Sequence, residues 1–130
     1  MLKKLLVAVG IFAVLTILLA GCNATISSGS FVDHSSNAKS TSWTVSASSA
    51  NGYESRTIDM SADNLSALNV VSSNSDGTVS LVITQGDNTQ TVDINQQFSG
   101  NIDTSRFSPG KVELRLNYDN AKNMFIAINW

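Results

Sequence analysis

The sequence predicts an all-β fold, and we expect an antiparallel β-sandwich of about eight short strands, immunoglobulin-like or jelly-roll-like. From Trp43 onward, apolar and polar residues alternate, which is typical of strands with one buried face. Turn-forming pairs such as Asn51-Gly52 and Asp76-Gly77 separate these stretches at intervals of about 8 to 12 residues. Abundant Ser, Thr and Asn disfavour helices, because short polar side chains compete for backbone hydrogen bonds. A small closed β-barrel is the alternative.

The alternation also places the individual elements. Trp43 and Trp130 are expected in the core, since both fall in phase with aliphatic neighbours. Residues 119–123 are expected to connect the last two strands, and Ser61 to cap a loop or single helical turn. The expected strands comprise residues 43–47, 53–60, 68–73, 79–83, 92–98, a short strand at Ile102, 112–118 and 124–130.

Residues 1–21 are typical of a secretory signal peptide. Lys3 and Lys4 form a basic start, and residues 5–20 form an uncharged, largely apolar run. This run is shorter than the roughly 20 residues that a membrane-spanning helix needs. The alternatives are an uncleaved membrane anchor and an ordinary signal peptide cut after a small residue.

The apolar run ends in Leu19-Ala20-Gly21-Cys22, which contains the only cysteine of the chain. These residues resemble the lipobox of bacterial lipoproteins. The resemblance implies cleavage between Gly21 and Cys22 and acylation of Cys22 with diacylglycerol and palmitate. It also implies a lipid-anchored location on the outer side of the bacterial cell membrane. No other cofactor is expected, and two acyl chains suffice for stable anchoring, whereas one is marginal.

Residues 22–42 are rich in Ser and Asn and show no sustained period, so we expect Cys22 to be followed by a flexible tether. Phe31-Val32 interrupts this stretch, as either a first edge strand or a docking contact. The sandwich domain is then expected at residues 43–130. The mature chain also resembles small surface lipoproteins of Gram-positive type, and this resemblance implies no particular activity.

The net charge of the mature chain limits the classes of partner that it can bind. Without residues 1–21, six Lys/Arg face ten Asp/Glu, a net charge of about −4. This acidic balance argues against nucleic acid as a partner. With Cys22 acylated, no thiol remains for a disulfide, a metal site or a nucleophile.

Few residues are suited to catalysis or metal binding. The only histidine, His34, lies in the expected tether, where it is not held beside a nucleophile. Asp93 and Asp103 are the kind of carboxylate pair that a glycosidase needs, but ten scattered acids produce such pairs by chance. Acids at the expected turns suit calcium, yet Asp also occurs at turns for local hydrogen bonding. These turn residues are Asp76, Asp87, Asp103 and Asp119. No EF-hand spacing is present, so we expect neither an enzyme nor a metal site.

Binding is the remaining class of function. Phe125, Val82 and Val71 fall on the side opposite the expected core residues, and Tyr53 is expected to be partly exposed. Such residues stack on sugars or contact a protein, unless loops cover them. We therefore expect a non-enzymatic envelope module that binds a glycan or a protein. The alternative is a small envelope hydrolase or hydrolase inhibitor.

Overall fold

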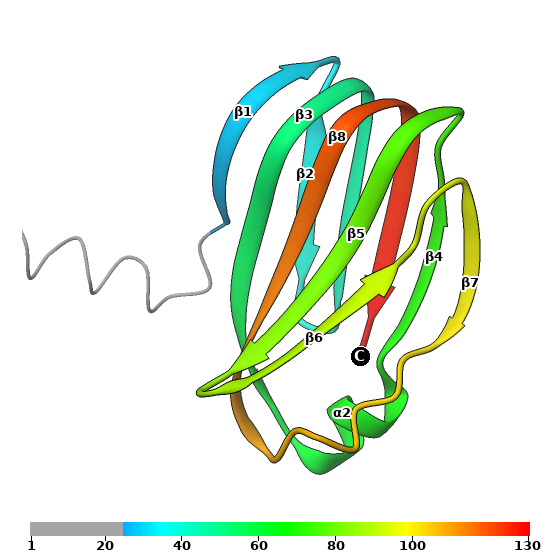
Figure 1. Cartoon of the computed structure of the whole chain (residues 1–130). Helices are drawn as coiled ribbons and strands as arrows, with labels where there is room; N and C mark the ends of the chain where they lie inside the picture. The colour runs from blue at the N-terminus through cyan, green and yellow to red at the C-terminus, as the bar shows by residue number, and fades with distance from the viewer. Residues whose placement is uncertain (1–24) are drawn as a thin grey trace, which may run out of the picture.

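The computed structural model describes residues 25–130, which form one sheet of eight strands with a short helix (Figure 1). The all-β prediction is confirmed. The predicted signal peptide, the Gly21-Cys22 cleavage site and Cys22 itself lie outside the described residues. The elements are β1 (Ile26–Val32), β2 (Ser35–Lys39), β3 (Ser42–Met60), α2 (Ala62–Ala67), β4 (Asn69–Ser73), β5 (Asp76–Gln85), β6 (Asn88–Asp93), β7 (Gln97–Asn101) and β8 (Gly110–Asn129).

Strands β1 and β2 form one continuous edge of the sheet. Their antiparallel register along β3 runs from Ile26 opposite Ser55 to Lys39 opposite Ser42 without a slip. We call residues 26–39 the edge strand. A two-residue turn then reverses the chain into β3, so the edge strand and β3 form a long hairpin.

Strands β4 and β5 follow one another along β8 in the same way. Ser73 lies opposite Phe125 and Asp76 lies opposite Lys122, after which the register slips by one residue beside Asp76. Strand β8 is therefore central, with β3 on one side and β4 and β5 on the other. β6 pairs with β5 and β7 pairs with β4, and these two strands form the second edge.

The long strands bend over a common line, the crease, which we define by Gly29, Gly52, Gly77 and Asn120. Gly29 and Gly52 lie opposite each other with φ of +131° and +130°. A Cβ on Gly52 would overlap the carbonyl oxygen of Ser28 and lie 2.7 Å from the Cα of Gly29. Glycine supplies both the positive φ and the close backbone approach that this bend requires.

Folding at the crease turns the sheet into two layers, as Figure 1 shows. The first layer contains residues 26–28 of β1, residues 52–60 of β3, residues 110–119 of β8, residues 78–85 of β5, and β6. The second layer contains residues 31–32 of β1, β2, residues 42–50 of β3, residues 121–129 of β8, β4 and β7. The architecture is sandwich-like. Within residues 25–130 no strand joins the two edges, so the closed-barrel alternative is wrong.

The hydrophobic core lies between the layers. Trp43 and Trp130 are both buried there, as predicted. Helix α2 contributes Leu65 to the core, and the hydroxyl of its N-cap Ser61 accepts a hydrogen bond from the amide of Asn64 at 3.1 Å, so the predicted helical turn is confirmed. No helix within residues 25–130 has the length and apolar character to cross a membrane.

The predicted tether is wrong for residues 26–39, which form the edge strand, so the folded domain begins well before residue 43. Nearly all of these residues are exposed, and only Phe31 packs against the core. Backbone hydrogen bonds to β3 hold this strand in place. Because these bonds do not require apolar side chains, the sequence of the strand shows no apolar alternation.

Three predicted turns also differ from the structure. Asn51-Gly52 lies inside β3, and residues 119–123 lie inside β8. Asp76-Gly77 was expected to close a hairpin, but β4 and β5 do not pair with each other. Residues that tolerate positive φ serve here to bend continuous strands at the crease, as Asn120 does with a φ of 49°.

Candidate functional site

Near the crease the second layer carries the charged Lys122, and Asp33 accepts a hydrogen bond from Ser48. Away from the crease, the outward-facing residues of this layer form three rows across five strands. We call this surface the neutral face. In the order β2, β3, β8, β4 and β7, the rows contain Ser35, Ser46, Phe125, Ser73 and Gln97, then Asn37, Thr44, Ala127, Val71 and Ser99, then Lys39, Ser42, Asn129, Asn69 and Asn101. None of these residues is buried, and only Lys39, at one corner, is charged.

Phe125 and Val71 form an apolar patch at the centre of the neutral face. Their exposed fractions are 44% and 45%. Phe125 lies opposite Ser73, and Val71 lies opposite Ala127. The two are therefore diagonal neighbours on adjacent strands, within side-chain reach of one another. Hydroxyl and amide groups surround them.

The neutral face is an open surface. Strands about 4.8 Å apart give it a width of roughly 19 Å, and three rows along strands that rise about 3.4 Å per residue give a length of roughly 14 Å. No cavity occurs within the part of the chain that the structure describes. The neutral face is therefore suited to binding on an open surface and not in a cavity.

The outer face of the first layer, which we call the charged face, has a different composition. Its acidic residues are Asp59, Asp93, Glu113 and Asp119, and its basic residues are Lys111 and Arg115. The guanidinium of Arg115 lies 3.8 Å from the centre of the Tyr53 ring, a cation–π arrangement. Val82 lies opposite Arg115 on β5.

The four predicted binding residues are therefore divided between the two faces. The structure brings Phe125 together with Val71 on the neutral face, and it places Tyr53 and Val82 on the charged face, on either side of β8. These faces lie on opposite sides of the folded sheet (Figure 1). No single surface carries all four residues.

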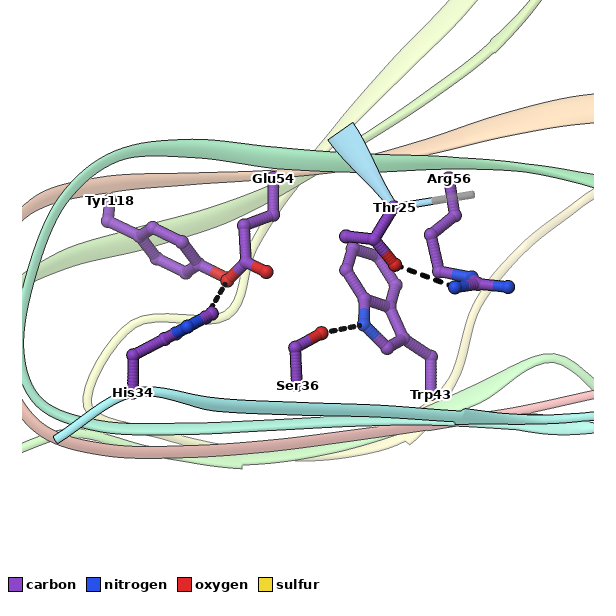
Figure 2. A network of polar contacts seen from close by, with 7 residues as sticks. All are labelled: Thr25, His34, Ser36, Trp43, Glu54, Arg56 and Tyr118. Carbon is purple, nitrogen blue, oxygen red and sulfur yellow. Dashed lines mark hydrogen bonds and ion pairs between the residues drawn. The ribbon is translucent and has the colours of Figure 1, made fainter. Parts of the chain in front are cut away.

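A polar cluster lies between the layers beside the edge strand, as Figure 2 shows. Nε2 of His34 and Oε1 of Glu54 are 2.8 Å apart, and the hydroxyl of Tyr118 donates to the same Oε1 at 2.9 Å. Glu54 is 0% exposed and His34 26% exposed by side chain. Burial, together with the nearby charge of Glu54, raises the pKa of Tyr118 far above its ordinary value. Tyr118 therefore remains protonated and donates its hydrogen bond at all ordinary pH values.

Contacts from the edge-strand side extend this cluster. The Phe31 ring lies 4.6 Å from the His34 ring and 5.9 Å, edge-on, from Tyr118. Nε1 of Trp43 donates to the hydroxyl of Ser36 at 3.0 Å. These contacts hold the edge strand against the rest of the sandwich.

Arg56 connects the cluster to the residue just before the edge strand. Its Nη1 donates to the hydroxyl of Thr25 at 2.6 Å, and burial lowers the pKa of Arg56. Oε2 of Glu54 and Nε of Arg56 are buried atoms with no hydrogen-bond partner within residues 25–130. The cluster therefore includes polar atoms that folding removes from water without full compensation.

The prediction of a mobile His34 is wrong, because Glu54 and Phe31 fix its ring. Glu54 was not predicted to be an interior residue. A signal was present, since Glu54 and Arg56 alternate in phase with the buried Ile58 and Met60. An acid within an inward-facing series indicates a buried partner.

Three acids at turns accept hydrogen bonds within their own loops. Side-chain oxygens of Asp76, Asp93 and Asp103 each accept a hydrogen bond from a backbone amide one or two residues further on, at 2.9, 2.9 and 3.0 Å. This is the local hydrogen bonding that favours Asp at turns. Within residues 25–130, no three His, Cys, Asp or Glu residues come close enough together to share a metal ion.

No protein-family model, curated protein or solved structure matches the chain. Its function is therefore inferred from the chemistry of its surfaces. The charged face has the mixed charge of an ordinary solvated sheet, whereas the neutral face combines exposed apolar groups with uncharged hydrogen-bonding groups.

Proposed function

We propose that the protein is a lipid-anchored, non-enzymatic binding module on the outer side of the bacterial cell membrane, and that its neutral face binds an uncharged stretch of envelope glycan. One observation carries the proposal: three rows of outward side chains contain a single charge, and that charge lies at a corner. A surface of this composition suits a ligand that is itself uncharged and rich in hydroxyl groups.

The chemistry of a sugar chain matches the residues of this face. The apolar side of a sugar ring packs on the exposed Phe125 and Val71. Sugar hydroxyls exchange hydrogen bonds with the Ser, Thr, Asn and Gln side chains around them, each of which donates and accepts. An ionic ligand finds no opposite charge near the centre of the face, so its desolvation is uncompensated.

A protein partner fits the neutral face less well. Protein–protein interfaces are enriched in Tyr, Trp, Phe, Met and Arg and depleted in Ser. Of the enriched types the neutral face contains only Phe125, whereas five of its fifteen residues are serines, namely Ser35, Ser42, Ser46, Ser73 and Ser99. Its composition therefore favours a glycan.

The anchor is tested by fractionation of cells that express the full chain. Replacement of Cys22 by Ser removes the acylated thiol that the lipobox resemblance implies, so the variant is expected in the soluble fraction. Retention of Cys22→Ser in the membrane fraction would show that the lipid anchor is wrong.

The ligand is tested by binding of detergent-solubilised protein to an array of neutral and charged glycans and to insoluble neutral polysaccharides. We expect retention on neutral chains of several sugars and its loss on Phe125→Ala. Tyr53→Ala, which removes an aromatic ring from the charged face, is the matched control and is expected to bind normally. Retention on anionic polymers alone, or equal loss in both variants, would contradict the proposal.

A further inference from the structure

The folded domain begins very close to the proposed lipid anchor. Thr25 is held by its hydrogen bond from Arg56, and β1 starts at Ile26. Only three residue steps separate Cys22 from Thr25. Whatever their conformation, three steps span at most about 11 Å. An acylated Cys22 would therefore hold the start of the edge strand at the lipid headgroups.

The side chains at this point of the fold differ between the two faces. Ile26 is 50% exposed and lies in the first layer, opposite Ser55. The same cross-strand line continues to Arg115 and Val82, and Arg115 covers the ring of Tyr53. We call Ile26, Tyr53, Val82 and Arg115 the interfacial row. All four lie on the charged face.

The interfacial row has the composition of a membrane-surface contact. Tyr combines an apolar ring with a polar hydroxyl and is favoured at the membrane–water interface. Arg places an apolar stem against apolar surface while its charge remains in water. The exposed Ile26 adds an aliphatic group beside the anchor. The neutral face lies on the opposite side of the sandwich.

We infer that the charged face lies against the lipid bilayer through the interfacial row, and that the neutral face points away from the membrane. This inference rests on the proposed lipid anchor. It also assigns a role to Tyr53 and Val82, which the proposed glycan site leaves unused. The neutral face is then presented to the polymers outside the membrane.

The charges predict which lipids favour this orientation. The charged face carries four carboxylates against two basic groups, so it is repelled by anionic headgroups. The partner is therefore a zwitterionic lipid surface. Anionic lipids are expected to weaken the contact while the acyl chains keep the protein bound.

The test uses the acylated full chain in phosphatidylcholine vesicles that contain a quencher-labelled lipid. Because the chain has one cysteine, and acylation blocks it, a new cysteine can carry a fluorophore. Thr57→Cys labels the charged face and Thr44→Cys labels the neutral face; both positions lie on β3 and are partly exposed. We expect at least threefold stronger quenching at position 57. Equal quenching, or stronger quenching at position 44, overturns the orientation.

Two further variants separate orientation from folding. A ten-residue Gly/Ser insertion between Asn23 and Ala24 is expected to reduce the quenching difference, because it frees the domain from the surface. Ile26→Ser is expected to reduce it as well, whereas Val32→Ser is the control, since Val32 is equally exposed at the other end of β1. Unchanged quenching in both the insertion and Ile26→Ser overturns the inference.

Flotation of the protein with the vesicles is measured first and separates the two proposals. Failure to float would overturn both, because the orientation depends on the anchor. Flotation with equal quenching at positions 44 and 57 would overturn the orientation alone. Loss of the quenching difference when phosphatidylglycerol is added is the result expected from the acidic charge of the face.

Discussion

The neutral face and the charged face are made from the same strands, yet they differ in chemistry. Strand β3 gives Ser42, Thr44 and Ser46 to the neutral face, and Tyr53, Thr57 and Asp59 to the charged face. Strand β8 likewise gives Phe125 to one face and Lys111, Glu113 and Arg115 to the other. The crease divides one strand into two surfaces. Exposure to solvent alone therefore does not explain the missing charge on the neutral face.

The difference between the faces indicates what each is exposed to. Sheet surfaces usually carry interspersed charges, which keep a protein soluble and oppose association. The charged face follows this rule. The neutral face departs from it while exposing Phe125 and Val71, and this departure is the basis of the proposal that its ligand is neutral.

The largest expected effect comes from breaking the crease that separates the faces. In Gly52→Ala the new Cβ meets the backbone of Ser28 and Gly29, at a φ of +130° that Ala rarely adopts. Because backbone surrounds the site, little relaxation is available. We expect a loss of about 3 kcal/mol or more, seen as a fall in Tm of more than about 10 °C.

Gly100→Ala is the control for this experiment, because a Cβ at Gly100 has no atom within 4 Å. Its Tm is expected to change by only a few degrees. If Gly52→Ala and Gly100→Ala melted at the same temperature, the close approach of the strands at the crease would be wrong.

The next largest effect on stability is expected in the polar cluster, which holds the edge strand in place. This strand borders both faces. Tyr118→Phe removes one of the two hydrogen bonds to Oε1 of the buried Glu54. A hydrogen bond to a charged group contributes about 1.5–3 kcal/mol, so we expect a loss of about 2 kcal/mol. Urea unfolding measures it. Tyr53→Phe, on the charged face, is the control and is expected to change stability by less than about 0.5 kcal/mol.

A third experiment addresses the faces directly. Phe125→Ala is expected to weaken binding to a neutral glycan at least tenfold, about 1.4 kcal/mol, because it removes the ring on which a sugar packs. Tyr53→Ala is expected to leave the affinity within twofold. Titration calorimetry or retention on an affinity gel measures both variants. An affinity that depends on Tyr53 and not on Phe125 would move the site to the charged face.

Much of the fold could be predicted from local patterns. Alternation of Val112, Leu114 and Leu116 correctly indicated strand residues with one buried side. It could not show that this strand continues to Asn129, because Asn at positive φ is equally suited to a reversal and to a bend. The edge strand was missed because its pairing with β3 is a backbone interaction, which does not require apolar side chains.

For the candidate site, the sequence predicts which side chains point outward but not which of them share a face. The phase of each strand correctly showed that Phe125, Val71 and Val82 point away from the core. Phase carries no information about which layer a strand segment belongs to. That assignment depends on the crease, which places Phe125 and Val82 on opposite sides of the molecule.

The smallest expected effects concern pH, which is expected to change the stability of the fold and to leave glycan binding by the neutral face unchanged. The backbone and side-chain hydrogen bonds from Ser105 hold the pKa of Asp103 below its ordinary value. The unfolded chain therefore binds a proton more readily, so the stability that Asp103 contributes is present above about pH 4 and is lost as the pH falls through the lower, folded pKa. Asp103→Asn is expected to flatten the decline of Tm between pH 4 and pH 2 slightly, and an unchanged slope would contradict this role.

Glycan affinity is expected to behave differently over the range in which the protein stays folded. The rows of the neutral face contain no carboxylate and no imidazole, so no group there changes its charge between pH 4 and pH 8. Affinity measured by retention should therefore remain constant in this range and in added salt, while Tm falls in acid. An affinity that followed pH or ionic strength would assign binding to the carboxylates and cations of the charged face, because only that face carries several groups that respond to them.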